Sequence, residues 1–166
     1  MREHYQPIQS QLSLSHQPLE VVKALLAFYP FTQLYIADLN AIQKIEGTYN
    51  GNNGNGNNGN GNNGNDNNVH GNTYTVNTNF SVIEAIAEYF PTLTLWVDAG
   101  TSNKTELNIW DKLKAKLVFG SENFAHIDDY LLLSRLKNDY ILSLDFFAEG
   151  YRGPIELLTN SEYWPQ

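Results

Sequence analysis

Apolar residues recur along this chain with two spacings that alternate. Four stretches carry apolar residues every three or four positions, which predicts amphipathic helices, and four shorter stretches are continuously apolar, which predicts buried strands. The expected helices cover residues 18–29, 81–90, 106–114 and 126–136, and the expected strands cover residues 34–37, 93–97, 116–119 and 140–144. Because a helix precedes each strand, this order predicts an α/β fold with a parallel sheet flanked by helices.

Two of the expected helices have recognisable boundaries. Pro18 stands in a first turn, where its missing N–H costs nothing, and Pro30 ends the apolar pattern that follows it. Ser81 and Glu84 have the spacing of a capping box, which predicts that the second helix starts there.

A run of Asn and Gly, residues 50–79, separates the first expected strand from the second helix. Between Gly51 and Asn65 the unit Gly-Asn-Asn-Gly-Asn is repeated three times. Such a segment has little to bury, so we expect a disordered insert within a single domain of residues 1–166. An Asn-rich self-association tract is the alternative, and the frequent Gly disfavours it.

Composition and charge exclude several classes of function. The net charge of −8 has the wrong sign for a nucleic-acid binder, and the absence of Cys excludes thiol catalysis and disulfides. No stretch reaches the roughly 18 apolar residues of a membrane span, and no signal peptide is visible, so we expect a cytoplasmic protein. The four His have no metal-ligand spacing, so we expect no metal, and no motif indicates a cofactor.

The candidate chemistry lies where the expected strands end. Asp38, Asp98 and Asp145 each follow a strand, and Gly120 and Ser121 follow another. Ligand sites of parallel α/β sheets lie at the carboxyl ends of the strands, so these residues form a candidate site. Converging carboxylates can act as acid and base, and a Gly-Ser turn before a helix can hold a phosphate. The ordinary alternatives are helix caps and tight turns.

Four stretches of the chain resemble the (β/α)8 barrels of histidine biosynthesis, the family of the ProFAR isomerase and of the cyclase subunit of imidazole-glycerol-phosphate synthase. Residues 34–41, Leu-Tyr-Ile-Ala-Asp-Leu-Asn-Ala, resemble the second strand of that family, and residues 5–26 resemble the stretch that leads into its first helix. Residues 117–121, Leu-Val-Phe-Gly-Ser, resemble the fourth strand with its phosphate-binding turn. Residues 140–145, Tyr-Ile-Leu-Ser-Leu-Asp, with Gly-Tyr-Arg-Gly at 150–153, resemble the fifth strand and its loop.

The resemblance implies a partial (β/α)8 (TIM) barrel and an Amadori-type aldose–ketose isomerisation of a phosphorylated sugar. Asp145 matches the catalytic acid, Gly120 and Ser121 match part of a phosphate site, and Arg152 lies in the loop that follows the fifth strand. We expect Asp38 and Asp98 to contact the same small phosphorylated metabolite.

The chain also departs from that family in three places. The family's first-strand aspartate would precede Met1, and strands six to eight would follow Gln166. Asp98 stands where the family has a glycine turn, and its charge would repel a phosphate. We therefore expect a diverged isomerase-like member, of a subgroup associated with one-carbon metabolism, that is truncated at both ends and inactive alone.

Two other readings of the sequence are open. A non-catalytic half-barrel would bind a small phosphorylated ligand or pair with a second copy through its open sheet edges. A complete doubly wound domain would place the three acids in one pocket suited to Mg²⁺. Pattern and length alone favour the doubly wound sheet, since a closed barrel needs roughly 250 residues.

Overall fold

The computed structural model describes residues 10–44, 79–137 and 139–165. Within them, four parallel strands form one sheet in the order β1-β2-β3-β4. These strands are β1 (Gln33–Ala37), β2 (Thr94–Asp98), β3 (Lys116–Gly120) and β4 (Tyr140–Ser143). The main helices are α1 (Pro18–Phe28), α3 (Phe80–Tyr89), α4 (Lys104–Trp110) and α5 (Ile127–Leu136). The expected α/β fold with a parallel sheet is confirmed.

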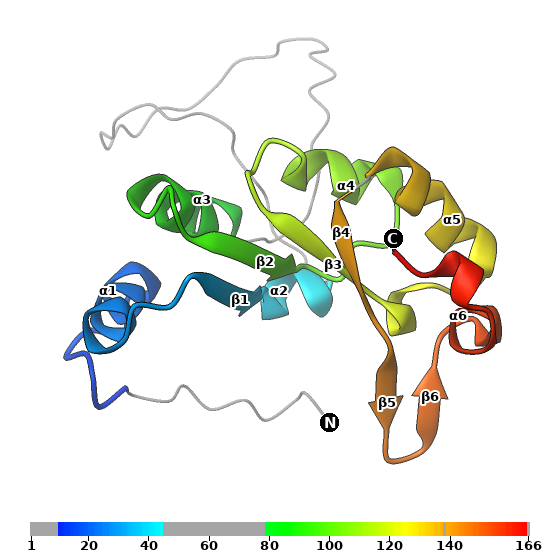
Figure 1. The fold of residues 1–166 in the computed structure, drawn as a ribbon, viewed down its shortest axis with the longest axis horizontal. Coiled ribbons are helices and arrows are strands. Elements are labelled where there is room, and N and C mark those ends of the chain that lie inside the picture. The colour runs from blue at the N-terminus through cyan, green and yellow to red at the C-terminus, as the bar shows by residue number, and fades with distance from the viewer. Residues whose placement is uncertain (1–9, 45–78, 138, 166) are drawn as a thin grey trace, which may run out of the picture.

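The strand order separates the two α/β architectures. A doubly wound sheet reverses its strand order at a switch point. In the described residues each strand instead lies beside the next one in sequence, always on the same side. With right-handed crossovers, this order places α3, α4 and α5 on one face of the sheet, as Figure 1 shows. The doubly wound alternative therefore has no support in this sheet.

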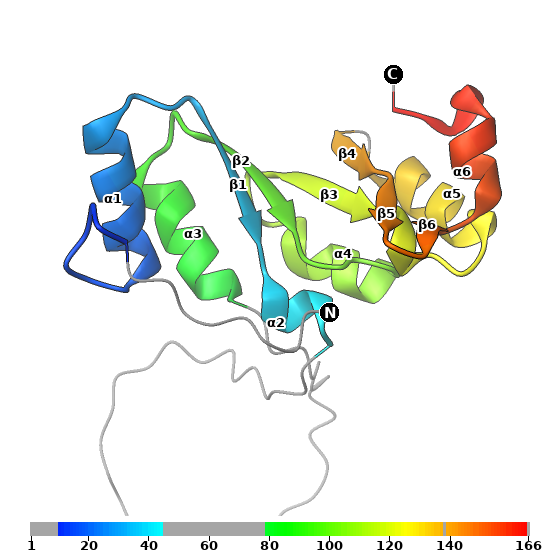
Figure 2. The same cartoon turned by 90° about the horizontal axis from the view of Figure 1, so that it is seen from below.

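The helix-covered face of the sheet forms the core. Its side chains alternate along the strands, and Leu95, Val97, Leu117 and Phe119 are fully buried beneath the helices. The largest helix side chains packed against them are Trp110 and Tyr130, both at most 2% exposed. α1 packs against α3 at the β1 end of the sheet (Figure 2). The period of two along each strand thus sends one set of side chains into the core.

The opposite face of the sheet is much more open, especially near β1. Tyr35 is 54% exposed, Ala37 is exposed, and Trp96 on the neighbouring strand is half-buried. Toward β3 the same face becomes closed, because Val118 is only 4% exposed.

Within the described ranges, every helix is too short or too polar to span a bilayer.

Several local expectations were wrong. α3 begins at Phe80 with Asn79 as its N-cap, so Ser81 lies inside the helix and forms no capping box. α4 begins earlier than expected, because the side chain of Asn103 accepts a hydrogen bond from the Glu106 N–H, and it ends at Trp110. Residues 145–152, expected as the end of a strand and its loop, form an antiparallel hairpin of β5 (Asp145–Phe147) and β6 (Gly150–Arg152).

Four short elements complete the described chain: α2 (Leu39–Ile42), the 3-10 turns η1 (Ser121–Asn123) and η2 (Ser161–Tyr163), and α6 (Ile155–Thr159). η1 and the hairpin follow the carboxyl ends of β3 and β4, so both lie at the edge where the candidate site was expected (Figure 1). The expected Asn/Gly insert lies outside the described residues, apart from Asn79.

Candidate functional site

The carboxyl edge of the sheet brings together the ends of β2, β3 and β4. Asp98 is aligned with Val118, and Gly120 is aligned with Ser143. Asp145 follows β4 by two residues, and a methyl group built on Gly120 would lie 2.9 Å from its Oδ2 atom. Gly120 and Asp145 therefore share one edge of the sheet, as the parallel strand order predicts.

Asp145 is held by a compact set of hydrogen bonds from this edge. Its Oδ1 accepts from the Ser143 hydroxyl at 2.9 Å, and its Oδ2 accepts from the Glu122 backbone N–H at 3.1 Å. The buried Ser121 hydroxyl accepts from the Asp145 N–H at 2.9 Å and donates to the Arg152 carbonyl at 2.6 Å. These bonds tie the start of β5 to η1 and to the end of β6.

This arrangement bears directly on the expected phosphate site. A phosphate at the Gly120–Ser121 turn would bind the backbone N–H groups that begin η1. One of these, the Glu122 N–H, already donates to the carboxylate of Asp145. Ser121 is fully buried and its hydroxyl is engaged on both sides. The chain's own carboxylate thus engages one of the donors that an anionic ligand at this turn would use.

Asp38 has a structural role at the end of β1. It is 2% exposed and caps α2 by accepting from the Ala41 N–H at 3.3 Å. It also accepts from the backbone N–H and the side-chain amide of Asn79, both at 2.7 Å, and Asn79 is the residue that starts α3. The carboxylate therefore joins two segments that are far apart in sequence. The alternative explanation, that Asp38 is a helix cap, accounts for its position.

Asp98 lies on the open face of the sheet at the end of β2. Its Oδ2 accepts from the Tyr35 hydroxyl at 3.0 Å and its Oδ1 accepts from the Gly100 N–H at 3.1 Å. Gly100 has φ +59°, and a methyl group there would meet the Ile42 backbone at 2.8 Å, so the turn after β2 requires glycine. Asp98 is half-buried, as Asp145 is, whereas Asp38 is buried.

Arg152 lies on the hairpin at the end of β6. Its side chain is exposed, its guanidinium lies 4.6 Å from the centre of the Phe147 ring, and its Nη2 is 3.4 Å from Glu149. Both contacts are local to the hairpin. The structure thus explains the Arg152 side chain without a ligand.

The three acids do not converge on one point. In the described part of the chain, no group of three or more His, Asp or Glu side chains is placed to hold a metal ion. Asp38 is turned toward Asn79, whereas Asp145 is bound to the turn after β3. The Mg²⁺ pocket required all three carboxylates together, so the alternative that depends on it is wrong for these residues.

The open face carries two aromatic residues that were not among the predicted site residues. Tyr35 and Trp96 are directly aligned on β1 and β2, and the Trp96 indole N–H is buried without a hydrogen-bond partner. The signal was present in the sequence, because both residues occupy strand positions that alternate with core residues. A large aromatic residue at such a position points to a face that something covers or contacts.

The chain matches no protein-family model, no curated protein and no solved structure. The resemblance to the histidine-biosynthesis barrels therefore rests on the sequence motifs alone.

Proposed function

We propose that this chain is a half-barrel subunit that binds a second copy of itself through the open face of its sheet and through the edge strands β1 and β4. The observation that carries this proposal is the open face of the parallel sheet, where, in the described residues, Tyr35 and Ala37 are exposed and Trp96 beside them is half-buried. Parallel sheets are normally covered on both faces, because their strands are apolar on both sides. A (β/α)8 barrel meets this need by curling the sheet until its inner face is closed.

The strand count and direction support this form of association. The sheet has four parallel strands in sequential order, with β1 and β4 at its two edges. A two-fold axis along the strands would place β4 of each copy beside β1 of the other, which gives eight strands with one direction. Both carboxyl edges would then meet at one rim, where each copy contributes Asp98.

A matched pair of substitutions tests this association. Ala37→Lys adds a charged side chain to the open face at the β1 edge, and Ala85→Lys adds the same side chain to an exposed position of α3. The 18.8 kDa chain is expected to have twice its monomer mass by light scattering after size exclusion. Ala37→Lys is expected to give monomers because a buried lysine in the interface is costly.

The control is expected to leave the dimer intact. A wild-type chain that is monomeric over the whole concentration range refutes the half-barrel proposal. So does an Ala85→Lys variant that dissociates as readily as Ala37→Lys, since association would then not depend on the open face.

A second candidate is the isomerisation of a phosphorylated aminoaldose, which the family resemblance implies. The specific observation that favours it is that Asp98 and Asp145 both lie at the carboxyl edge. In that reaction one carboxyl group protonates the ring oxygen and another assists removal of the proton from carbon 2. Asp145 would take part only after leaving its bonds to Ser143 and Glu122.

The isomerase candidate has its own test. The chain is incubated with a phosphorylated aminoaldose and the ketose product is measured, for the wild type, Asp145→Asn and Asp129→Asn. Asp129 is an exposed acid in the first turn of α5 and serves as the control. The candidate predicts product that is lost only in Asp145→Asn. A wild-type chain without turnover excludes it and leaves the half-barrel proposal standing.

A further inference from the structure

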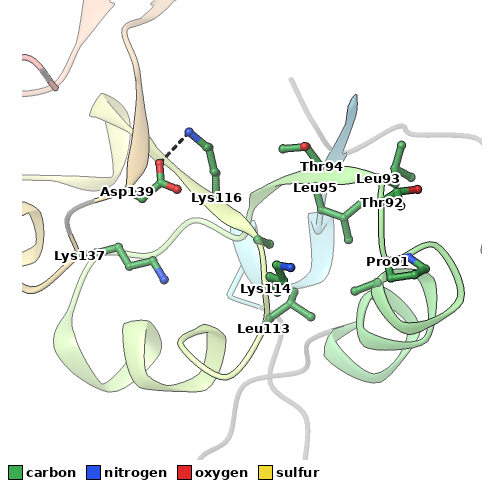
Figure 3. Close-up of a pocket in the computed structure, with 12 residues that line it drawn as sticks. Pro91, Thr92, Leu93, Thr94, Leu95, Leu113, Lys114, Lys116, Lys137 and Asp139 are labelled. Carbon is green, nitrogen blue, oxygen red and sulfur yellow. Dashed lines mark ion pairs between the residues drawn. The ribbon is translucent and has the colours of Figure 1, made fainter. Parts of the chain in front are cut away.

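A cavity of about 550 Å³ lies at the amino edge of the sheet, opposite the edge that carries Asp98 and Asp145 (Figure 3). It is bordered by the three connections that lead from α3, α4 and α5 into the next strand. These connections contribute Pro91, Lys114 and Lys137, among others. The volume falls within the roughly 300–1,000 Å³ of small-molecule sites.

One part of the cavity lining is apolar. Leu93, Leu95 and Leu113 are all at most 9% exposed and line it together with Ala87 and Ala115. In Figure 3, Leu93 and Leu95 lie on the same side as Pro91, Leu113 lies beside Lys114, and Lys116, Lys137 and Asp139 lie on the other side. The cavity therefore offers an apolar surface next to a polar one.

The polar part of the lining is cationic. Three lysines, Lys114, Lys116 and Lys137, line the cavity with a single acid, Asp139, in a chain whose net charge is −8. The net charge of the whole chain is negative, whereas lysines outnumber acids in the cavity lining. The sign of the charge at the cavity is therefore opposite to that of the chain as a whole.

The ion pairs that Lys116 and Lys137 already form are weak enough for these lysines to bind an anion as well. Lys116 pairs with Asp139 at 2.7 Å, but both side chains are solvent-accessible, so the pair is screened and weak. The Lys137 side chain is 17% exposed, and its Nζ donates to an Asp111 oxygen at 3.4 Å, a distance beyond that of a strong charge-assisted bond. Lys114 has no ion pair or hydrogen bond to any described residue.

We propose that this cavity binds an organic anion with an apolar body, such as a carboxylate on a medium-length hydrocarbon chain. The carboxylate binds Lys137 with Lys114 nearby, Lys116 adds positive charge at the border of the cavity beside Asp139, and the hydrocarbon lies on Leu93, Leu95 and Leu113. The inference goes beyond the half-barrel proposal and does not depend on it, because a single copy of the chain supplies the whole lining of this cavity.

Octanoate is a suitable probe, with 1-octanol and inorganic phosphate as the two comparisons. The full chain is titrated with each compound by calorimetry, and methyl resonances of Leu93 and Leu113 are followed by NMR to locate binding. Octanoate is expected to bind at least about tenfold more tightly than either comparison, since only it uses both a charge-assisted bond and apolar burial. Its binding is expected to shift the two leucine resonances.

Three lysine variants complete the test. Lys137→Gln is expected to weaken octanoate binding about tenfold, and Lys116→Gln provides a second variant at a more exposed position should Lys137→Gln not fold. Lys112→Gln, an exposed lysine outside the cavity, is expected to bind as the wild type does. The proposal is overturned if phosphate or octanol binds as tightly as octanoate, if Lys112→Gln loses as much affinity as the cavity variants, or if the leucine resonances do not shift.

Discussion

Replacement of Asp38 is expected to destabilise the fold without depending on any ligand. Asp38→Ala removes three hydrogen bonds to a buried carboxylate, two from Asn79 at 2.7 Å and one from the Ala41 N–H at 3.3 Å. A hydrogen bond to a charged group contributes about 1.5–3 kcal/mol. The Asn79 donors can turn to water because that residue is exposed, and the Ala41 bond is long, so we take the lower end for all three bonds and expect a total loss of about 4.5 kcal/mol.

The assay is urea denaturation followed by tryptophan fluorescence. Asp38→Asn retains one acceptor oxygen but turns a donor toward the Asn79 donors, so it is expected to lose about half as much free energy of unfolding as Asp38→Ala. Asp128→Ala, an exposed acid in the first turn of α5, is expected to stay within about 0.5 kcal/mol of the wild type. An Asp38→Ala variant as stable as this control would refute the structural role of Asp38 and return it to the list of ligand-binding candidates.

Two further predictions concern the hairpin and a buried phenol. Gly153→Ala would place a methyl group 2.6 Å from the Ser121 carbonyl oxygen at φ +132°, whereas Gly150→Ala at φ +113° meets nothing within 4 Å. Urea denaturation is expected to show a loss of roughly 3 kcal/mol for Gly153→Ala and about 1 kcal/mol for Gly150→Ala, and equal losses would contradict the steric argument. Burial raises the pKa of the Tyr130 phenol above its ordinary value of 10.0, which the unfolded chain retains. The protonated phenol therefore contributes its full stabilisation below pH 10.0, and this contribution is lost as the pH rises further. The free energy of unfolding is measured at a series of pH values from neutral to above 10.0. It is expected to fall less steeply with rising pH in Tyr130→Phe than in the exposed control Tyr29→Phe. Parallel curves would contradict a raised pKa of Tyr130 in the folded state.

The parallel sheet could be predicted because each strand is apolar along its whole length and follows a helix. Such strands cannot pair through tight turns, and the helices between them impose a common direction. The boundaries of the helices were harder to predict, since they depend on single hydrogen bonds. Because Asn103 caps α4, this helix begins earlier than its apolar pattern predicted. Ser81 was mistaken for the N-cap of α3, whereas the N-cap is Asn79, two residues earlier.

The candidate site could be placed from the sequence but its chemistry could not. Parallel strands bring Gly120 and Asp145 to one edge whatever their partners are. The partners that decide the role of an acid are contributed by distant residues, as Asn79 is for Asp38 and Glu122 is for Asp145. The hairpin after β4 also escaped prediction, because its strands have only three residues each and show no usable periodicity.

The anchoring of Lys44 and Asn79 has a consequence for how the chain could be engineered. The Lys44 ammonium binds the Gly100 carbonyl and Glu106 at 2.7 Å each, and Asn79 is fastened to Asp38. Lys44 and Asn79 are thus fastened to the framework by partners that are themselves described residues. A fluorescent protein or affinity module introduced between these two positions is expected to leave both anchoring points in place.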